Sequence, residues 1–460
     1  MYHIDFQKPR RVHFIGIGGI SMSGLAEILI TEGFRVSGSD SVRSHLTDHL
    51  ISLGAEIHIG QRAANIAEDI EVVVYTAAIR PDNEEYQAAI QRGLPVLSRA
   101  ELLGQMMKNY RAAIAVSGTH GKTSTTAMIS EILMTAGKEP TISIGGIMPS
   151  IGGNIRVGKS ECFVTEACEY TNSFLHFFPT TAVILNVRED HMDFFRDLQE
   201  IRDSFRQFAE LLPEGGLLVI NRDIPELEEL TRDLRCRVKT YSLSAPDADF
   251  RAVNVVLDED ACGSFDVVKR GVTMGRIRLK VPGTHNVANA LAAIAVADSM
   301  GIGLDEMQVG FEHYTGVERR FEKKGVVGGV EVFDDYAHHP DEIRATLTMA
   351  NQVKKKKLWC VFQPHTYTRT RAFLKEFIEA LAMADEVVLA KIYAARESDN
   401  LGVSSEDIAR GLREKGKKAV YLESFGEIED FLLQHCVHGD LLITMGAGDV
   451  VKVGEALLGK

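Results

Sequence analysis

Residues 112–134 read Ala-Ala-Ile-Ala-Val-Ser-Gly-Thr-His-Gly-Lys-Thr-Ser-Thr-Thr-Ala-Met-Ile-Ser-Glu-Ile-Leu-Met, and this stretch decides the fold class. The apolar run that ends at Val116 predicts a strand, and the run from Thr126 onward predicts a helix. Gly118 and Gly121 lie between them and predict a tight loop, because glycine adopts positive φ at little cost. Strand, glycine loop and helix in this order are typical of an α/β fold built on a parallel sheet.

The loop also carries the groups that bind phosphate. Its backbone N–H groups and the positive end of the following helix make a concave site for phosphate oxygens. Lys122 would reach the outer phosphates, and the Thr123 hydroxyl would be a ligand of Mg²⁺. Val116 stands where the common P-loop has its first glycine, so the loop is a shorter variant. A plain strand-to-helix turn is the alternative, but Gly-Lys-Thr in this context favours ATP and Mg²⁺ as cofactors.

Composition is that of an ordinary globular enzyme. The chain has 460 residues, 45% of them hydrophobic, and a formal charge of −13, which predicts about three domains and disfavours nucleic acid or acidic lipid as a partner. The six scattered cysteines form no CxxC pair and predict reduced thiols. No run of about 18 apolar residues predicts a membrane span, and the apolar run from Val12 is too soon broken by glycines for a signal peptide. We expect a cytoplasmic protein.

A second glycine loop lies near the N-terminus. Gly16, Gly18 and Gly19 follow an apolar strand and lead through Ile20 and Ser21 into a helix, and Asp40 follows the next strand. In a dinucleotide fold such a loop lies under a pyrophosphate, and the acid binds a ribose. The third glycine of the usual fingerprint is replaced by Ser21, so three interpretations remain open: an NAD site, a site for a nucleotide diphosphate carried by the substrate, and a structural turn.

Alternation of strands and helices predicts three α/β domains: a Rossmann-like N-terminal domain (1–107), a central P-loop ATPase-like domain with a parallel sheet (108–315) and a Rossmann-like C-terminal domain (316–460). The first expected strand begins at Arg11 and turns through the glycines into a helix. The other expected strands include 34–37, 56–59, 72–75, 95–97, 112–116, 162–165, 182–186, 330–333, 358–362, 386–389 and 441–445. The expected helices after the phosphate loop are at 196–212, 286–300, 340–352, 370–384 and 404–414.

Both glycine loops in one chain, with a third α/β segment, resemble the Mur ligase family of cell-wall peptide-forming enzymes, and the resemblance runs along essentially the whole chain. It rests on these stretches: Phe14-Ile-Gly-Ile-Gly-Gly-Ile-Ser-Met-Ser-Gly, Gly118-Thr-His-Gly-Lys-Thr, Asn186-Val-Arg-Glu-Asp-His-Met-Asp, Gly283-Thr-His-Asn-Val-Ala-Asn-Ala, Arg319-Arg-Phe, Asp334-Asp-Tyr-Ala-His-His-Pro, Phe362-Gln-Pro-His-Thr-Tyr-Thr-Arg and Gly446-Ala-Gly-Asp.

The resemblance implies a three-domain ligase that joins L-alanine to UDP-N-acetylmuramate. The lactyl carboxylate would attack the γ-phosphate of ATP, and the amine of L-alanine would displace phosphate from the acyl phosphate. Several Mur ligases have a metal-bridging carbamoylated lysine in the central domain. This chain has no lysine between Lys159 and Lys239, as in the alanine-adding branch. We expect a monomer or a homodimer.

Most site residues are assigned by the resemblance alone. The catalytic set is Lys122, His191, Arg320 and Asp335. The ATP-binding set is Gly118, Thr119, His120, Gly121, Lys122, Thr123, Ser124, Asn286, Asn289, Arg320 and Asp335. Thr123, Glu166 and His191 would hold Mg²⁺, with Asp190 and Asp193 as oxygen alternatives to the histidine because Mg²⁺ prefers oxygen. Gly16, Gly18, Gly19, Ile20, Ser21 and Asp40 would bind the UDP group.

The amino-acid site is expected in the C-terminal domain. Tyr336 and His338 would lie near the alanine, and Arg369 would bind its carboxylate through two parallel hydrogen bonds. Other members of this branch can carry arginine where this chain has Thr366, so the chain departs from the family pattern at this position.

Three other functions remain open. A wall-recycling ligase would join a whole tripeptide to the same UDP-muramic acid, although such enzymes usually have bulkier residues in the first glycine loop. An NAD-dependent oxidoreductase would explain the first loop and Asp40 but leave Lys122 unused. A regulatory P-loop NTPase would hydrolyse ATP without an amino acid.

Overall fold

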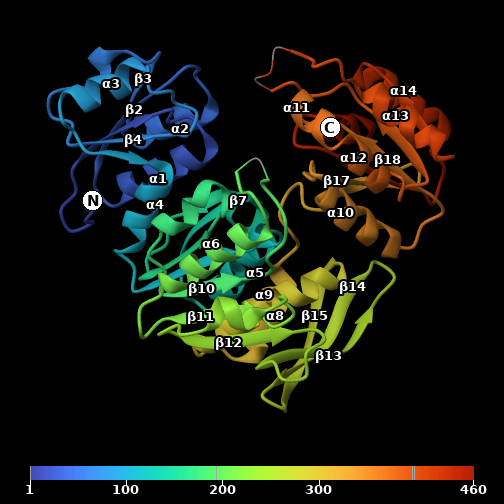
Figure 1. Ribbon diagram of the computed structural model, residues 1–460, viewed down its shortest axis with the longest axis horizontal. Coiled ribbons are helices and arrows are strands. Elements are labelled where there is room, and N and C mark those ends of the chain that lie inside the picture. The colour runs from blue at the N-terminus through green and yellow to red at the C-terminus, as the bar shows by residue number, and fades with distance from the viewer. Residues whose placement is uncertain (1, 193, 396, 398) are drawn as a thin grey trace. The chain divides into compact units, whose positions relative to one another are not determined.

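The computed structural model describes residues 2–192, 194–395, 397 and 399–460. It has three sheets, each formed mainly by parallel strands with helices between them (Figure 1). The chain divides into two compact units, one of residues 1–255, 265–278 and 285–315, and one of residues 256–264, 279–284 and 316–460. The first sheet and most of the central sheet therefore belong to one unit. The third sheet belongs to the other unit, together with short parts of β13 (Phe250–Leu257), β14 (Cys262–Lys269) and β15 (Val272–Pro282). Among the described residues no helix is both long and apolar enough to cross a membrane.

The first sheet has the strand order β3-β2-β1-β4-β5, and all four neighbouring pairs are parallel. Its inner strands β2, β1 and β4 are buried along most of their length, as expected for a parallel sheet whose two faces are covered by helices. Its elements are β1 (Arg11–Ile15), α1 (Ile20–Thr31), β2 (Arg35–Asp40), α2 (His45–Ser52), β3 (Glu56–Ile59), η1 (Ala63–Asn65), β4 (Val72–Tyr75), α3 (Glu84–Gln91), β5 (Val96–Ser98) and α4 (Arg99–Met107).

The central sheet has the order β15-β14-β13-β12-β11-β10-β6-β9-β7-β8. Its strands are β6 (Ala112–Ser117), β7 (Thr141–Met148), β8 (Gly153–Arg156), β9 (Cys162–Glu166), β10 (Thr181–Ile184), β11 (Leu217–Asn221), β12 (Arg237–Ser242), β13 (Phe250–Leu257), β14 (Cys262–Lys269) and β15 (Val272–Pro282). The segments from β6 to β12 pair in parallel, except for the antiparallel pair of β7 and β8.

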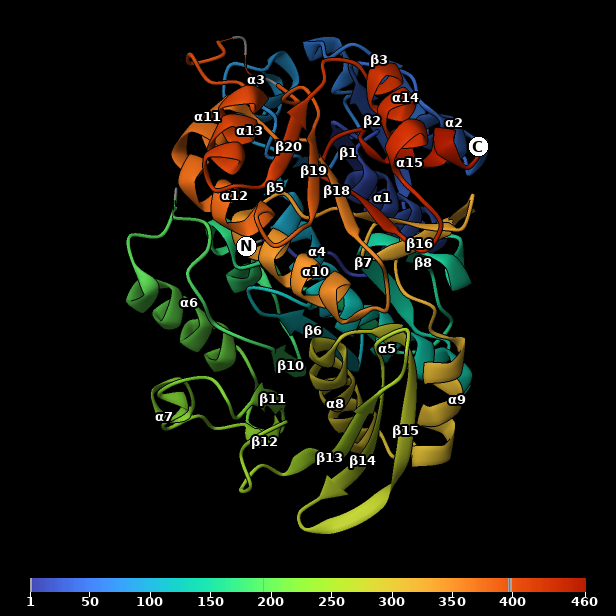
Figure 2. The same cartoon turned by 90° about the vertical axis from the view of Figure 1, so that its right-hand side faces the viewer.

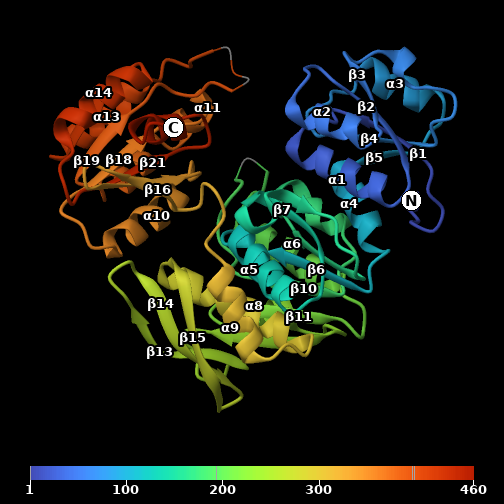
Figure 3. The same cartoon turned by 180° about the vertical axis from the view of Figure 1, so that it is seen from behind.

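Helices cover both faces of the central sheet. Its helices are α5 (Lys122–Thr135), η2 (Pro149–Ile151), η3 (Tyr170–His176), α6 (Leu198–Glu210), α7 (Leu227–Thr231), α8 (Thr284–Ser299) and α9 (Leu304–His313). Figure 2 shows α5 and α6 on opposite sides of β6 and β10. Helix α5 packs against α9 (Figure 3). Buried side chains of the first sheet and of β6, β9 and β10 form one continuous apolar core, so these two sheets share their interior.

The third sheet has the order β16-β17-β21-β18-β19-β20 and is parallel except for β16, which pairs antiparallel with β17. Its elements are β16 (Glu322–Val327), β17 (Val330–Asp335), α10 (Pro340–Gln352), β18 (Leu358–Phe362), α11 (Tyr367–Ala372), α12 (Leu374–Leu381), β19 (Glu386–Leu389), α13 (Ser405–Glu414), β20 (Lys418–Tyr421), α14 (Phe425–His435), β21 (Leu441–Met445) and α15 (Val451–Leu457).

The expected fold class is therefore confirmed. The bounds differ in detail, and the helix expected at 370–384 is broken at Phe373 into α11 and α12. The expected bounds also did not include the strands β7, β8, β11–β16 and β20 or the helices α9, α14 and α15. All six cysteines are free thiols, as predicted.

Candidate active site

The phosphate loop is a cradle of backbone groups between β6 and α5. Gly118 and Gly121 have φ angles of +142° and +88°, which glycine adopts readily. Gly121 is the N-cap of α5, and its position lacks a side-chain cap. The N–H groups of the first turn of α5 are therefore available to an anion.

Asn186, which follows β10, fixes this loop from the neighbouring strand. Its Oδ1 accepts a hydrogen bond from the backbone N–H of His120 at 2.8 Å, and its Nδ2 donates to the His120 carbonyl at 2.9 Å. The Thr119 N–H donates to the Asn186 carbonyl at 3.1 Å. Sequence reasoning did not assign Asn186 to the site, although it opens one of the stretches that carry the family resemblance.

Lys122 is held inside the loop by a buried carboxylate. Its Nζ donates to the Gly118 carbonyl at 2.6 Å and lies 3.0 and 3.2 Å from the two carboxylate oxygens of Glu169. The Lys122 side chain is 15% exposed and that of Glu169 only 2%. Burial alone would lower the pKa of Lys122, but the negative charge of Glu169 outweighs it and the pKa is raised. The lysine therefore carries its positive charge at neutral pH, directly beside the loop.

Two groups of oxygen ligands lie next to this lysine. Glu166 ends β9, where its carboxylate accepts hydrogen bonds from the Thr123 hydroxyl at 3.2 Å and from the Gly145 N–H at 2.5 Å. The structure therefore joins two of the expected metal ligands, Thr123 and Glu166, at the carboxyl end of parallel strands.

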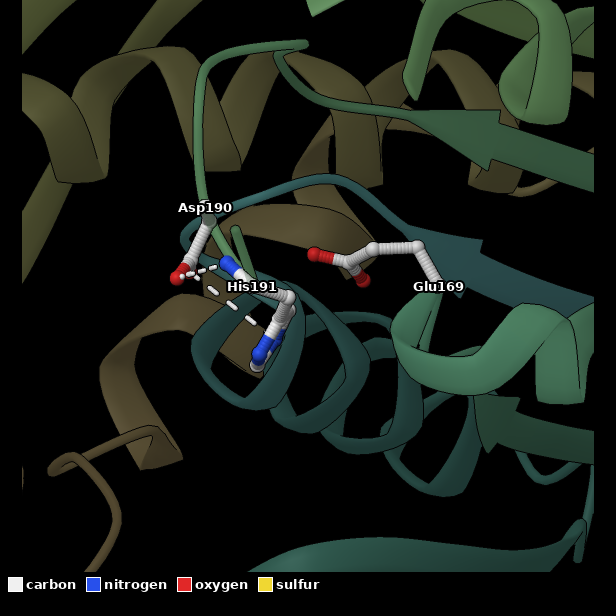
Figure 4. A group of neighbouring side chains, drawn as sticks. All are labelled: Glu169, Asp190 and His191. Carbon is white, nitrogen blue, oxygen red and sulfur yellow. Dashed lines mark hydrogen bonds and ion pairs between the residues drawn. The ribbon is translucent and has the colours of Figure 1, made fainter. Parts of the chain in front are cut away.

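The third expected ligand, His191, belongs to a separate group. One ligand atom each of Glu169, Asp190 and His191 lie within 4.8 Å of one another (Figure 4). His191 has a φ of +54°, and its ring stacks on Tyr170 at 4.5 Å between centroids. Sequence reasoning missed Glu169, whose only signal was its position three residues after Glu166. The oxygen alternative Asp193 lies outside the described residues.

The two asparagines of α8 lie against the loop and not in open space. Asn289 Nδ2 donates to Asn286 Oδ1 at 3.1 Å, and both side chains are buried. A Cβ placed on Gly121 would be 2.8 Å from Asn289 Oδ1. Asn289 therefore supports the cradle from behind and explains why glycine is needed there.

The backbone of the N-terminal glycine loop is hydrogen-bonded to the side chain of Asp40. The Gly18 N–H donates to Asp40 Oδ2 at 2.8 Å, and the N–H groups of Gly16 and Ile17 both donate to the Ser39 carbonyl. Of the remaining expected UDP-binding residues, Gly19 is the N-cap of α1 without a side-chain cap, while Ile20 and Ser21 are exposed. The start of α1 is thus a second place where backbone N–H groups face outward at the carboxyl end of a strand.

In the C-terminal unit the two neighbouring arginines have different surroundings. Arg319 is tied to Asp334 at 2.9 Å and donates to the carbonyls of Gly446 and Gly448. Arg320 is exposed and has no ion pair among the residues that the structure describes. Arg320, whose guanidinium lies 5.9 Å from the centre of the Tyr336 ring, is the more accessible of the two arginines. Its role toward ATP stays a prediction.

Asp335 is buried at the end of β17. Its two carboxylate oxygens accept hydrogen bonds from the N–H groups of Phe321, at 2.8 Å, and Ala337, at 2.7 Å. Burial raises the pKa of Asp335 to about 6, against the opposing charge of Arg320. This carboxyl group orders the backbone around Arg320 and is placed to change its charge near neutral pH.

The three residues expected to bind the amino acid lie in one chain of contacts. Tyr336 contacts His338 directly, and His365 connects His338 to Arg369. The His338 ring lies 5.5 Å from the Tyr336 ring and 5.9 Å from the His365 ring, and Arg369 lies 3.4 Å from His365 Nδ1. Burial, His338 and Arg369 together lower the pKa of His365, and burial also lowers that of His338. Neutral imidazoles beside a guanidinium can accept protons or hydrogen bonds from an ammonium group and leave the guanidinium for a carboxylate.

Thr366 has a structural role next to this group. It has a φ of +68°, an outlier for a β-branched residue, and its hydroxyl accepts the Arg369 N–H as the N-cap of α11. The threonine thus fixes the start of the helix that carries Arg369.

A phosphate loop with a paired lysine, carboxylates at the ends of parallel strands and two flanking α/β sheets define an ATP-binding ligase-like class of P-loop protein. Three family models match the chain: the catalytic domain of the Mur ligase family at residues 11–111, the Mur ligase middle domain at 116–297 and the Mur ligase glutamate ligase domain at 319–448. The chain belongs to the Mur ligase family.

Individual relatives are similar along the whole chain. The UDP-N-acetylmuramate–L-alanine ligase of Lachnospira eligens is 55% identical over 458 residues, covering 100% of both chains. The crystal structure of the UDP-N-acetylmuramate–alanine ligase of Thermotoga maritima has a TM-score of 0.80 at 32% identity and covers 98% of both chains. The UDP-N-acetylmuramate:L-alanyl-γ-D-glutamyl-meso-diaminopimelate ligase of Neisseria meningitides has a TM-score of 0.61 at 31% identity and covers 68% of this chain and 100% of its own.

Proposed function

We propose that this chain uses ATP to join L-alanine to the lactyl carboxylate of UDP-N-acetylmuramate, the first peptide-forming step of peptidoglycan precursor synthesis. The observation that carries the proposal is the 55% identity to a ligase of that name over 100% of both chains. Such a match includes the N-terminal glycine loop and the C-terminal amino-acid site as well as the phosphate loop, which an NTPase or an oxidoreductase would leave unexplained.

A carboxylate needs activation before it forms an amide in water. The lactyl carboxylate would attack the γ-phosphate of ATP, giving an acyl phosphate and ADP, and the alanine amine would then displace phosphate. Bringing an anion to a polyanion demands positive charge and alignment. Lys122 supplies the charge: it would exchange Glu169 and the loop carbonyls for phosphate oxygens.

Mg²⁺ fits the donors at the loop. The Thr123 hydroxyl and the carboxylates of Glu166, Glu169 and Asp190 are hard oxygen ligands of the kind this ion prefers, with His191 beside them. When bound, the ion would neutralise charge on the β- and γ-phosphates. Glu169 is placed to hold the ion as well as Lys122, because its carboxylate contacts the lysine and lies within 4.8 Å of the ligand atoms of Asp190 and His191.

The two other substrates are assigned to the first and third sheets. The UDP group would bind at Gly16–Ser21 at the start of α1. The alanine carboxylate would bind Arg369, and its amine would lie near His338 and His365. We further propose the domain boundaries 1–107, 108–315 and 316–460, a cytoplasmic location and a monomeric or homodimeric enzyme.

The test is phosphate release from ATP with Mg²⁺ and UDP-N-acetylmuramate, with L-alanine, glycine, L-serine or the tripeptide L-alanyl-γ-D-glutamyl-meso-diaminopimelate supplied in turn. Release that depends on L-alanine, with a product heavier by one alanine residue, is the expected result. The match to the Neisseria enzyme makes the tripeptide the second candidate, and release with the tripeptide alone would replace the proposal. Release without the muramic acid would refute both.

A further inference from the structure

Arg99 is an arginine without an anion. It is partly buried at the first position of α4, and among the described residues neither a hydrogen bond nor an ion pair reaches its guanidinium. Other arginines of the same unit are satisfied: the exposed Arg92 donates to the carbonyls of Ile66 and Glu68, and the buried Arg202 is paired with Glu229.

The position of Arg99 disfavours its charge in two ways. Burial lowers the pKa of Arg99, because the guanidinium has lost water without gaining a carboxylate. A cation at the first turn of a helix also faces the positive end of the helix dipole. The helix start itself does not need the arginine, because Ser98 and Glu101 form a complete capping box around it. An anionic ligand would offset both costs.

The packing of α4 brings Arg99 toward the phosphate loop. This helix lies against η3, so closely that a Cβ on Gly104 would be 1.9 Å from the His176 carbonyl oxygen. Cys168, which directly precedes Glu169, is close enough to act electrostatically on the pKa values of both Arg99 and Lys122. Arg99 therefore lies beside the segment that carries Glu169, the partner of Lys122.

Sheet geometry relates Arg99 to the N-terminal glycine loop. Strand β5 ends directly before Arg99, two strands away from β1 in the parallel order β1-β4-β5. Two strand spacings of about 4.8 Å separate their carboxyl ends by roughly 10 Å. A ligand whose diphosphate lies at the loop after β1 can therefore extend along this edge to Arg99.

We propose that Arg99 binds the lactyl carboxylate of the UDP-N-acetylmuramate substrate and holds it next to the γ-phosphate position at Lys122. A guanidinium matches a carboxylate through two parallel N–H donors, and it would keep this match as one carboxylate oxygen bonds to phosphorus. The inference rests on the proposed function and adds a residue from the N-terminal domain to the reacting end of the substrate.

The experiment compares two nucleotides that differ only in the lactyl group, UDP-N-acetylmuramate and UDP-N-acetylglucosamine, by calorimetric titration without ATP. Arg99→Gln is expected to weaken binding of the first by ~10- to 100-fold, the range of a lost hydrogen bond to a charged group, and to leave the second unchanged. Arg99→Lys should recover part of the loss. The control is Arg62→Gln, an exposed arginine of the same domain, which should change neither.

Equal weakening of both nucleotides would assign Arg99 to the diphosphate, and unchanged binding with a lower thermal midpoint would make it structural; either result overturns the proposal. The midpoint of Arg99→Gln should equal or exceed that of the wild type, because an unpaired charge is removed. Failure of the proposed function would be seen separately: wild-type protein would distinguish the two nucleotides through Arg99 yet release no phosphate with L-alanine.

Discussion

Variants of the buried ion pair of Lys122 and Glu169 can separate the effect of the pair on folding stability from its effect on turnover. Lys122→Met removes the only cation that, among the described residues, forms an ion pair with Glu169, whose side chain is 2% exposed. Removing one partner of a buried ion pair typically costs about 3–5 kcal/mol, whereas replacing both partners by apolar residues is close to neutral. Lys122→Met should therefore be destabilised by that amount, and Lys122→Met/Glu169→Leu should regain most of it. Both variants should lose turnover by orders of magnitude.

The assay must report on the central domain. The single tryptophan, Trp359, lies in the C-terminal unit, so its fluorescence does not serve here. Hydrogen exchange of peptides from β6 and α5 does, because opening of these elements exposes the loop. A loss of about 3 kcal/mol corresponds to roughly 10²-fold faster exchange, and the upper figure to more than 10³-fold.

A matched control exists in the same domain. Asp298 is paired with both Lys239 and Lys269, at 2.9 and 2.6 Å, so Lys239→Met leaves the carboxylate with a partner and should change exchange little. Wild-type exchange in Lys122→Met would refute the argument from the buried pair. Phosphate release by the double variant would refute the assignment of the phosphate loop.

Three further predictions concern single groups. Arg369→Ala should raise the KM for L-alanine by ~10- to 100-fold and that for ATP far less in steady-state kinetics, while the exposed Arg371→Ala changes neither; equal effects on both substrates would move alanine elsewhere. Gly121→Ala should lower kcat/KM for ATP at least ~10-fold, because its φ of +88° costs an L-residue about 1–2 kcal/mol and its Cβ would overlap Asn289; wild-type kinetics would contradict the cradle. Asp335 has a pKa near 6 when folded, above its ordinary 3.8, so its contribution to stability is complete below about pH 4 and is lost as pH rises through 6, a change on the order of 3 kcal/mol. Urea unfolding followed by tryptophan fluorescence should show this loss in the wild type but not in Asp335→Asn, and a constant difference between the two from pH 4 to 7 would contradict it.

The local sequence pattern was enough to predict many of the buried strands. The bounds expected for β4, β18, β19 and β21 are those observed, because a strand covered on both faces is mostly an apolar run. The bounds of the edge strand β3 match as well, although this strand is exposed or half-buried along its length. The strands β13–β15 alternate exposed and buried residues with many charges and were missed. The break at Phe373 was missed as well: the helix has no glycine or proline there, and the ring packs on His339 of another element.

The site residues, too, divide into those that local sequence predicts and those that depend on contacts between distant segments. Lys122 and Thr123 could be predicted, since backbone geometry within six residues sets their roles. Glu169, Asn186 and His365 could not be assigned from the residues. Glu169 and Asn186 meet the phosphate loop across 47 and 66 residues of sequence, and only the order of strands β6, β9 and β10 brings them together. His365 lies within five residues of Arg369, but its contact with His338 depends on two separate strand ends.

The groups that bear the chemistry share one physical property: each is arranged at a cost to the folded chain. Lys122 and Glu169 are a desolvated ion pair, Asp335 is a carboxyl group whose charge is disfavoured, and His191 and Thr366 have positive φ angles. These costs are concentrated at the carboxyl ends of the parallel strands, while the apolar core beneath is regular. Under the proposed function, phosphate, metal and amino acid would supply the charges that these groups lack, so each ligand should stabilise the unit that binds it. The sequence motifs and the strained geometry therefore point to the same edge of each sheet, which is where a ligase of this family must bring its substrates together.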